Sequence, residues 1–173
     1  IRDLYVTGVQ TCALPISKNS LPVTIEIDGR KIAFEAASTA VFNADSITRP
    51  QPPAAPDLSG DTTTVPLVKL VWGRSGDKGD KANIGLIARK PEYLPLVWAS
   101  LTEEVVASRF AHFLEGKTER FLMPAPNAIN FLLHDALGGG GVASLRNDAQ
   151  GKGFASLLLD QPVEVPIELA RNL

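Results

Sequence analysis

The sequence has very little cysteine, methionine or histidine. Among its 173 residues there is one Cys, one Met and two His. The single thiol, Cys12, falls in a terminal stretch that we set aside below, so the remaining chain has no disulfide, thiolate metal site or cysteine nucleophile. His112 and His134 are too far apart in sequence for a short metal-ligand spacing. We therefore expect no metal site, and the sequence leaves any cofactor unknown.

An excess of charge of one sign and long apolar runs are also missing. The net charge is −2, and lysines and arginines are interspersed with acids, so the chain lacks the basic footprint of a nucleic-acid-binding protein. No apolar run approaches the ~20 residues of a bilayer span, and no signal-peptide pattern opens the chain. With 45% hydrophobic residues the chain can bury one core. We expect a cytoplasmic protein with neither nucleic acid nor membrane as a partner.

The first residues do not read as part of the fold. Residues 6–16 look like an in-frame translation of a sequencing-library adapter, which makes 1–17 a non-native leader. In that case the natural gene continues upstream of Ser17 and the chain is a C-terminal fragment. The alternative is a disordered leader, and both interpretations exclude the stretch from fold reasoning.

A short hairpin and a linker follow. Val23, Ile25 and Ile27 alternate with polar residues before an Asp28-Gly29 turn, and the alternation then resumes. Residues 18–44 are too few for a core, so we interpret them as a hairpin remnant of a truncated upstream domain, with 35–44 ambiguous between strand and helix. Residues 45–64 contain four prolines and are interpreted as an extended linker.

The first half of the compact domain, placed at 65–166, alternates strands with helical segments. Apolar runs at 65–72 and 83–88 predict two strands joined by a wide loop, and 91–98 predicts a helical turn. Thr102 is a candidate N-cap for an amphipathic helix that begins with two acids and ends at Gly116. Residues 119–123 read as a further strand.

The second half predicts another helix and a closing hairpin. Asn127 is expected to cap a helix that carries apolar side chains on one face through Ala136 and stops at Gly138. Residues 142–145 and 154–159 would form the hairpin, leaving 167–173 as a tail. The predicted order β-β-α-β-α-β-β indicates an α+β, ferredoxin-like fold, a mainly antiparallel sheet with two helices on one face.

Three sequence blocks carry a family resemblance. They are GRSGDKGDKANIG, NFLLH, and LGGGG followed by SLRNDAQGK. Such long and unusual blocks do not arise readily by chance. Residues 65–166 resemble the small C-terminal domain of the acyclic terpene utilisation (AtuA) family. The resemblance implies a ferredoxin-like fold and a role in bacterial catabolism of acyclic terpenes or related acyl-CoA compounds, and it brings no agreed reaction or catalytic residue.

The stretch 72–89 is the best candidate site, because it combines three glycines with a dense set of polar side chains. The candidate ligand-binding residues there are Arg74, Ser75, Asp77, Lys78, Asp80 and Asn83. Asp77 replaces the closing glycine of a nucleophile elbow, and the glycine spacing fails the phosphate-loop template. Arg74 with Lys78 could hold a carboxylate or phosphate, or Asp77 and Asp80 could instead accept a hard cation or the hydroxyls of a ligand. Alternatively, the acids pair with the neighbouring cations and only brace a turn.

The predicted second helix adds further candidates. Asn127 and Asn130 would lie near its N-terminus, where the helix dipole favours an anion. His134 is either an acid or base on the same helical face or a satisfied, partly buried histidine. Whether the domain is an enzyme therefore stays open, with no catalytic residue assigned.

Two functions follow from these observations. The first is an accessory domain that binds a small anionic molecule through residues 74–83. The second is a structural module that mediates homo-oligomer formation, or docking onto a missing large N-terminal domain, through an exposed sheet face or edge.

Overall fold

A computed structural model describes residues 20–34, 43–141 and 143–173 of the chain. The chain divides into two compact units, one ending at Ile47 and the other spanning Thr48–Leu173. We describe each by itself. The predicted leader 1–17 and most of the ambiguous stretch 35–44 lie outside the described residues.

The first unit contains the predicted hairpin. Strands β1 (Val23–Ile27) and β2 (Arg30–Phe34) pair antiparallel, and Asp28 and Gly29 form the turn with φ of 50° and 73°. Val23 lies opposite Phe34 in this register, so their side chains share one face of the hairpin. The hairpin is confirmed, and its origin in an upstream domain stays a prediction.

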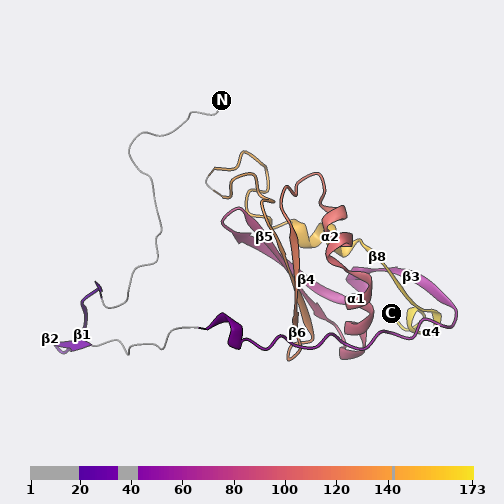
Figure 1. The fold of residues 1–173 in the computed structure, drawn as a ribbon, viewed down its shortest axis with the longest axis horizontal. Helices are drawn as coiled ribbons and strands as arrows, with labels where there is room; N and C mark the ends of the chain where they lie inside the picture. The colour runs from indigo at the N-terminus through magenta and orange to yellow at the C-terminus, as the bar shows by residue number, and fades with distance from the viewer. Residues whose placement is uncertain (1–19, 35–42, 142) are drawn as a thin grey trace. The chain divides into compact units, whose positions relative to one another are not determined.

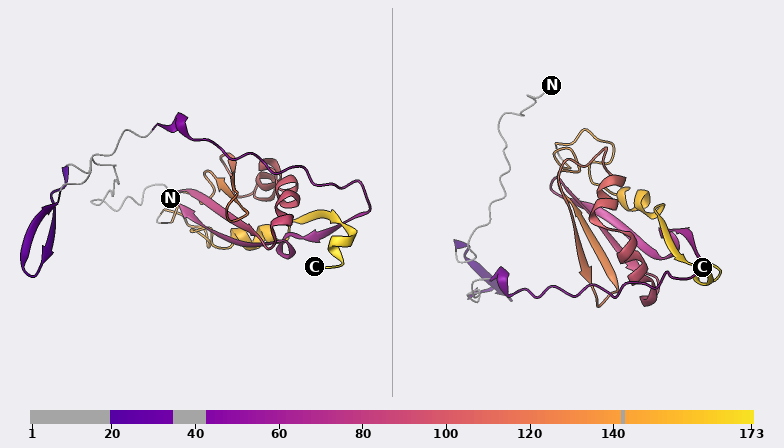
Figure 2. Two further views of the ribbon diagram at one scale, coloured as in Figure 1. Left: turned by 90° about the horizontal axis from the view of Figure 1, so that it is seen from below. Right: turned by 45° about the vertical axis from the view of Figure 1, so that its right-hand side comes forward.

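The second unit is built on a four-stranded antiparallel sheet with the order β4-β5-β7-β6. Its strands are β4 (Val71–Lys78), β5 (Lys81–Ala88), β6 (Thr118–Met123) and β7 (Ala128–Leu133). Helices α1 (Leu94–Ser100), α2 (Glu103–Arg109) and α3 (Phe154–Leu159) lie on one side of this sheet (Figure 1, Figure 2). We call the opposite side the outer face.

A second, smaller sheet completes the unit. Strand β3 (Thr62–Pro66) pairs antiparallel with β8 (Pro162–Pro166), and the short helix α4 (Ile167–Ala170) follows β8. Short 3-10 turns η3 (Leu67–Lys69) and η4 (Pro91–Tyr93) precede β4 and α1, whereas η2 (Ala44–Ser46) belongs to the first unit. The predicted turn at 91–98 is therefore η4 running directly into α1.

The hydrophobic core lies between the inner face of the large sheet and the helices. Phe131 from β7 and Phe110, just after α2, are fully buried, and the Phe110 ring stacks on Phe154 of α3 with centroids 5.0 Å apart. Each such side chain contributes about 1.5–3 kcal/mol through removal of its apolar surface from water. Because strand residues alternate between faces, filling this inner face sends every second side chain of β4, β5 and β7 to the outer face.

Helix α2 begins as predicted and ends early. Thr102 Oγ1 accepts a hydrogen bond from the Val105 backbone N–H at 3.3 Å, and two acids occupy the first turn. The helix stops at Arg109 rather than continuing to Gly116, because Phe110 already turns the chain into the core. The predicted strand at 119–123 is confirmed by β6.

Arg120 on β6 joins the sheet to the helices. Its Nη1 donates to the carbonyl oxygens of Trp98 at 2.6 Å and Leu101 at 2.8 Å, at the C-terminal end of α1. The guanidinium also stacks on the Trp98 ring, 3.7 Å from its centroid, and Glu103 Oε2 lies 3.6 Å from its Nε. This partly buried cation satisfies helix-end carbonyls that would otherwise lack partners.

Four predicted elements are wrong. Residues 65–72, expected to form one strand, are divided by η3 between the end of β3 and the start of β4. Residues 128–133, expected inside the second helix, form strand β7, because Ile129, Phe131 and Leu133 alternate toward the core in a central strand. Residues 154–159, expected to be a strand, form α3. Of the predicted strand 142–145, the described part forms a turn in which Ser144 N–H donates to Gly140 O at 2.8 Å.

The coarse fold class is confirmed, although the order of elements differs from the predicted one. The second unit combines antiparallel sheets with helices gathered on one face of the larger sheet. Among the residues that the structure describes, no helix is long and apolar enough to cross a bilayer.

Candidate functional site

The stretch predicted as a wide polar loop is a regular β-hairpin. Strand β4 continues to Lys78 and β5 starts at Lys81, so only Gly79 and Asp80 form the turn, with Gly79 at a φ of 63°. Because neighbouring residues of a strand point to opposite faces, the candidate side chains are divided between the two faces of the sheet. Arg74 and Ser75 illustrate the separation.

Ser75 faces inward and is only 6% exposed. Its Oγ donates to the backbone carbonyl of Lys152 at 3.0 Å and accepts from the backbone N–H of Ala155 at 2.9 Å. The hydroxyl thus fixes the start of α3 against β4. It is committed to the fold and has no remaining proton to offer a ligand.

Asp80 also holds the fold together. Its Oδ1 accepts from the backbone N–H groups of Leu137 at 3.0 Å and Gly139 at 2.9 Å, and its carbonyl accepts from Ala136 N–H. The glycine-rich segment lies so close to this turn that a Cβ on Gly140 would come within 2.7 Å of the Gly79 carbonyl oxygen. Asp80 therefore braces the turn, although with backbone groups rather than with the neighbouring cations.

Arg74 lies on the outer face and borders a polar cleft of about 350 Å³. The cleft is lined by Arg74, Ser75, Gly76, Asp77, Lys78, Asn83, Gly85 and Lys152. Lys152 Nζ lies 3.6 Å from Asp77 Oδ1, and Lys78 Nζ donates to the Asp77 carbonyl at 2.9 Å. The lining thus holds three cations and one carboxylate, and only Lys152 forms an ion pair with that carboxylate, which leaves the cleft positively charged.

The Arg74 guanidinium has no partner. It makes no hydrogen bond, ion pair or ring contact with any residue in the described parts of the chain. A planar guanidinium with free N–H groups matches the two oxygens of a carboxylate or phosphate. Arg74 is therefore the group in the polar cleft most suited to an anion.

An apolar groove of about 290 Å³ adjoins the polar cleft. It is lined by Trp72, Gly73, Arg74, Gly85, Leu86, Ile87, Met123, Pro126, Ala128, Ile129 and Asn130. Trp72, Ile87, Ala128 and Met123 lie opposite one another in successive strands, forming one row across the outer face. Arg74 and Gly85 line both hollows, so the polar cleft and the apolar groove meet at these two residues.

Two mid-strand glycines shape the floor of these hollows. Gly76 lies opposite Asn83, and Gly85 lies opposite Arg74 on one side and Asn130 on the other. Neither has a positive φ, and a Cβ on Gly85 would make only ordinary contacts, 3.8 Å from Arg74 O and 3.9 Å from Asn130 Oδ1. Glycine weakens a strand interior, so the open floor of the two hollows comes at some cost to the stability of the sheet.

The asparagines are arranged differently from the prediction. Asn83 Nδ2 donates to Asn130 Oδ1 at 3.3 Å across β5 and β7, and this pair stands at the border of the two hollows. Asn127 lies in the turn before β7 with a φ of 50°, and its carbonyl accepts from Ala88 N–H. Because β7 is a strand, the helix N-terminus on which the predicted anion contact depended does not exist.

His134 lines neither hollow. Its Nε2 lies 2.6 Å from Glu119 Oε2, and Lys117 Nζ donates to Glu119 Oε1 at 2.9 Å. The hydrogen bond from Lys117, followed by the one from His134, lowers the pKa of the Glu119 carboxyl below its ordinary 4.5. The histidine is a partnered side chain that the polar cleft does not include.

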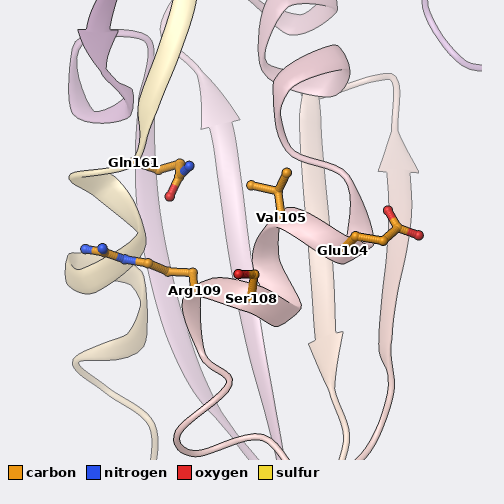
Figure 3. Close-up of a pocket in the computed structure, with 5 residues that line it drawn as sticks. All are labelled: Glu104, Val105, Ser108, Arg109 and Gln161. Atoms are coloured by element: carbon orange, nitrogen blue, oxygen red, sulfur yellow. The ribbon is translucent and has the colours of Figure 1, made fainter.

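A third hollow lies beside α2, with a volume of about 560 Å³ (Figure 3). It is lined by Glu104, Val105, Ser108, Arg109 and Gln161. Arg109 is already bound to the carbonyl of Leu157, at 3.2 Å from Nε and 2.9 Å from Nη2. Figure 3 shows Glu104 and Arg109 extending in opposite directions from α2, so their charges do not converge on a ligand. This shallow hollow is a weaker candidate than the polar cleft.

Sequence reasoning missed several residues of the outer face. Lys152 enters the polar cleft from the segment before α3, 77 residues after Ser75, whose hydroxyl binds its carbonyl. No local pattern could signal this approach. Trp72 and Ile87 belong to the central stretch, and their exposure of 54% and 46% follows from the alternation of β4 and β5 once both strands are correctly placed.

Comparison with known proteins gives one match. A search of curated proteins and a search of solved structures both return no match to this chain. The family model of the AtuA ferredoxin-like domain matches residues 65–164, which contain β4, β5 and both hollows of the outer face. Because this match covers more than half of the 173 residues, the chain belongs to the AtuA ferredoxin-like domain family.

Proposed function

We propose that the domain binds a small anionic molecule on the outer face of its large sheet, with Arg74 as the principal contact. The observation that carries the proposal is a guanidinium without a partner among the described residues, at the edge of a 350 Å³ cleft whose lining holds three cations and one carboxylate. A bidentate contact to a carboxylate or phosphate would use N–H groups that the fold leaves free.

The other polar groups would assist this contact. Lys78 and Lys152 contribute positive charge, while Asp77 holds Lys152 over the bare Cα of Gly76. The Nδ2 group of Asn130 keeps free N–H donors, because Asn130 uses Oδ1 in its bond to Asn83. Ser75 and Asp80 stabilise the hairpin that carries the site, and Asn127 and His134 have no direct part in it.

The family sets the expected context of this binding. A bacterial catabolic role on acyclic terpenes or related acyl-CoA compounds is the setting implied by the resemblance, and in it this domain would serve as an accessory ligand-binding module. His134, the predicted acid or base, is bound to Glu119 and does not line the cleft. Binding rather than proton transfer is therefore the function that we propose.

The test removes two cations of the cleft. Arg74→Ala combined with Lys78→Ala should abolish the chemical-shift changes caused by acetate and by phosphate in low salt, and leave the thermal midpoint nearly unchanged. The matched control, Lys69→Ala with Arg171→Ala, removes the same charge from residues that line neither hollow and should bind both anions normally. Loss of fold in the double variant, or equal binding in all three proteins, would overturn the proposal.

A second candidate function is a docking surface on the same face. It is favoured by the row of Trp72, Ile87 and Met123, whose side chains are 54%, 46% and 49% exposed. A homo-oligomer or a contact with another domain would cover this row. Light scattering of the wild type and of an Ile87→Asp variant separates the two functions. If the protein self-associates through this surface, the introduced charge should lower its measured molar mass; if it does not, the mass should stay the same.

A further inference from the structure

We infer that the anion is an amphipathic monocarboxylate, whose carboxylate binds Arg74 and whose aliphatic chain lies in the apolar groove. This inference rests on the proposed function, since it names the ligand class of the same site. It adds one claim: the two hollows are one composite site, because Arg74 and Gly85 line both.

The junction suits such a molecule. Arg74 lines both hollows, and an arginine side chain combines an aliphatic stem with a charged guanidinium, so it can contact both parts of such a molecule. Beside it, the missing side chain of Gly85 leaves room for the bond between head and chain to pass over β5. A ligand without an apolar part would leave the exposed Trp72 and Ile87 in water, and one without a charge would leave Arg74 unpaired.

The groove limits what the rest of the ligand can be. Its row of Trp72, Ile87, Ala128 and Met123 carries no charge, and the polar side chains among its lining, Arg74 and Asn130, are the residues nearest the polar cleft in the strand register. A second charge or a sugar would lose its water along most of the groove. The Arg89 guanidinium, 4.8 Å from the centroid of the Trp72 ring, could meet a second charge only at that end. Met123 is flexible and can adapt to the shape of an aliphatic chain.

The volume sets the approximate length of the chain. A methylene group occupies about as much space as a water molecule in the liquid, roughly 30 Å³, so the 290 Å³ of the groove corresponds to about ten such groups. Part of that volume opens to solvent. A chain of about eight carbons therefore suits the groove better than a two-carbon or a sixteen-carbon one.

Affinity should consequently rise with chain length. Full burial of a methylene is worth about a fourfold gain, and the open groove should give about half of the corresponding free energy, or roughly twofold per methylene. Across the six methylenes that separate acetate from octanoate, the expected gain is on the order of fiftyfold.

The experiment is a titration of the labelled protein with acetate, butyrate, hexanoate, octanoate and uncharged 1-octanol, all below micelle formation. The chain has two tryptophans, so two indole N–H signals can be followed. Trp72 lines the groove and its signal should move, while Trp98, stacked on Arg120, should not. Ile87→Ser should lower the affinity for octanoate at least fivefold and leave the affinity for acetate unchanged. Leu157→Ser, at an exposed position outside both hollows, should change neither affinity.

The outcomes separate this inference from the proposal beneath it. If acetate and octanoate bind equally through Arg74, the anion site stands and the amphipathic ligand is refuted. If octanoate and 1-octanol bind equally and Arg74→Ala has no effect, both claims fail. If octanoate moves the Trp98 signal as strongly as that of Trp72, binding is non-specific and the composite site is refuted.

Discussion

Replacing Gly85 by valine should block the candidate site and stabilise the protein at the same time. Gly85 sits in the middle of β5 without a positive φ, and a Cβ there would lie 3.8 and 3.9 Å from its nearest neighbours. The backbone can therefore accept a side chain without strain. Glycine in a strand interior costs about 0.5–1 kcal/mol relative to alanine, and valine is a better strand former still.

The expected gain is thus at least about 0.5–1 kcal/mol, which raises the midpoint of a domain of this size by roughly 2–4 °C. The valine methyl groups would fill the junction of the polar cleft and the apolar groove, so the affinity for octanoate should fall more than tenfold. Circular dichroism gives the midpoint and the same titration gives the affinity. Gly85→Val that melts several degrees lower, or binds octanoate normally, would refute the reasoning.

Gly140→Ala should have the opposite effect on stability. Its φ is +82°, and the new Cβ would meet the Gly79 carbonyl oxygen at 2.7 Å, a contact that the packed backbone cannot relieve cheaply. We expect a loss of about 1–3 kcal/mol from backbone strain alone, measured by urea denaturation. Equal stability of the two glycine variants would show that the local geometry at one of them is wrong.

Three further perturbations test the fold around the site. Ser75→Ala should cost about 2–3 kcal/mol, because it removes two hydrogen bonds from a buried hydroxyl, whereas Ser59→Ala on the exposed linker should stay within about 0.5 kcal/mol; equal effects would contradict the assignment. Arg120→Met should cost about 2–4 kcal/mol by leaving carbonyls such as that of Leu101 unpaired, and a loss below about 1 kcal/mol would count against this role. Because the pKa of Glu119 is lowered in the folded state, its contribution to the free energy of unfolding is present above its ordinary pKa of 4.5 and is lost as the pH falls through the folded value. Glu119→Gln should therefore lose less stability than the wild type between pH 6 and about pH 3, and parallel curves of stability against pH would contradict this.

Local signals in the sequence were sufficient where one residue type decides the structure. The Asp28-Gly29 turn and the Thr102 cap both predict their elements correctly, because a left-handed turn and an N-cap hydrogen bond depend on single side chains. The family blocks carried the resemblance that the family model confirms at residues 65–164.

Short apolar runs were the weak point. Residues 128–133 combine a helical spacing with an equally good alternation of Ile129, Phe131 and Leu133, and only the pairing of β7 between β5 and β6 selects the strand. The run 154–159 was read as a strand, yet it contains no β-branched residue, and Asp148 accepts from the backbone N–H groups of Lys152 and Gly153 just before α3. Tertiary context decided both segments.

The structure separates candidate residues that the sequence analysis grouped in one loop. Arg74, Asp77, Lys78 and Asn83 do line the polar cleft, while Ser75 gives its hydroxyl to the start of α3. Treating 72–89 as a loop hid the alternation that sends successive residues to opposite faces. The register of four strands was needed before the row opposite Trp72, and with it the apolar groove, could be recognised.

The most direct test of the outer-face site is a map of the backbone amides that respond to octanoate. The account predicts that the largest shifts occur at Gly76, Gly85 and Asn130, around Arg74, and that residues beside the α2 hollow, such as Ser108, stay unchanged. Shifts centred on α2, or spread evenly over the molecule, would contradict it.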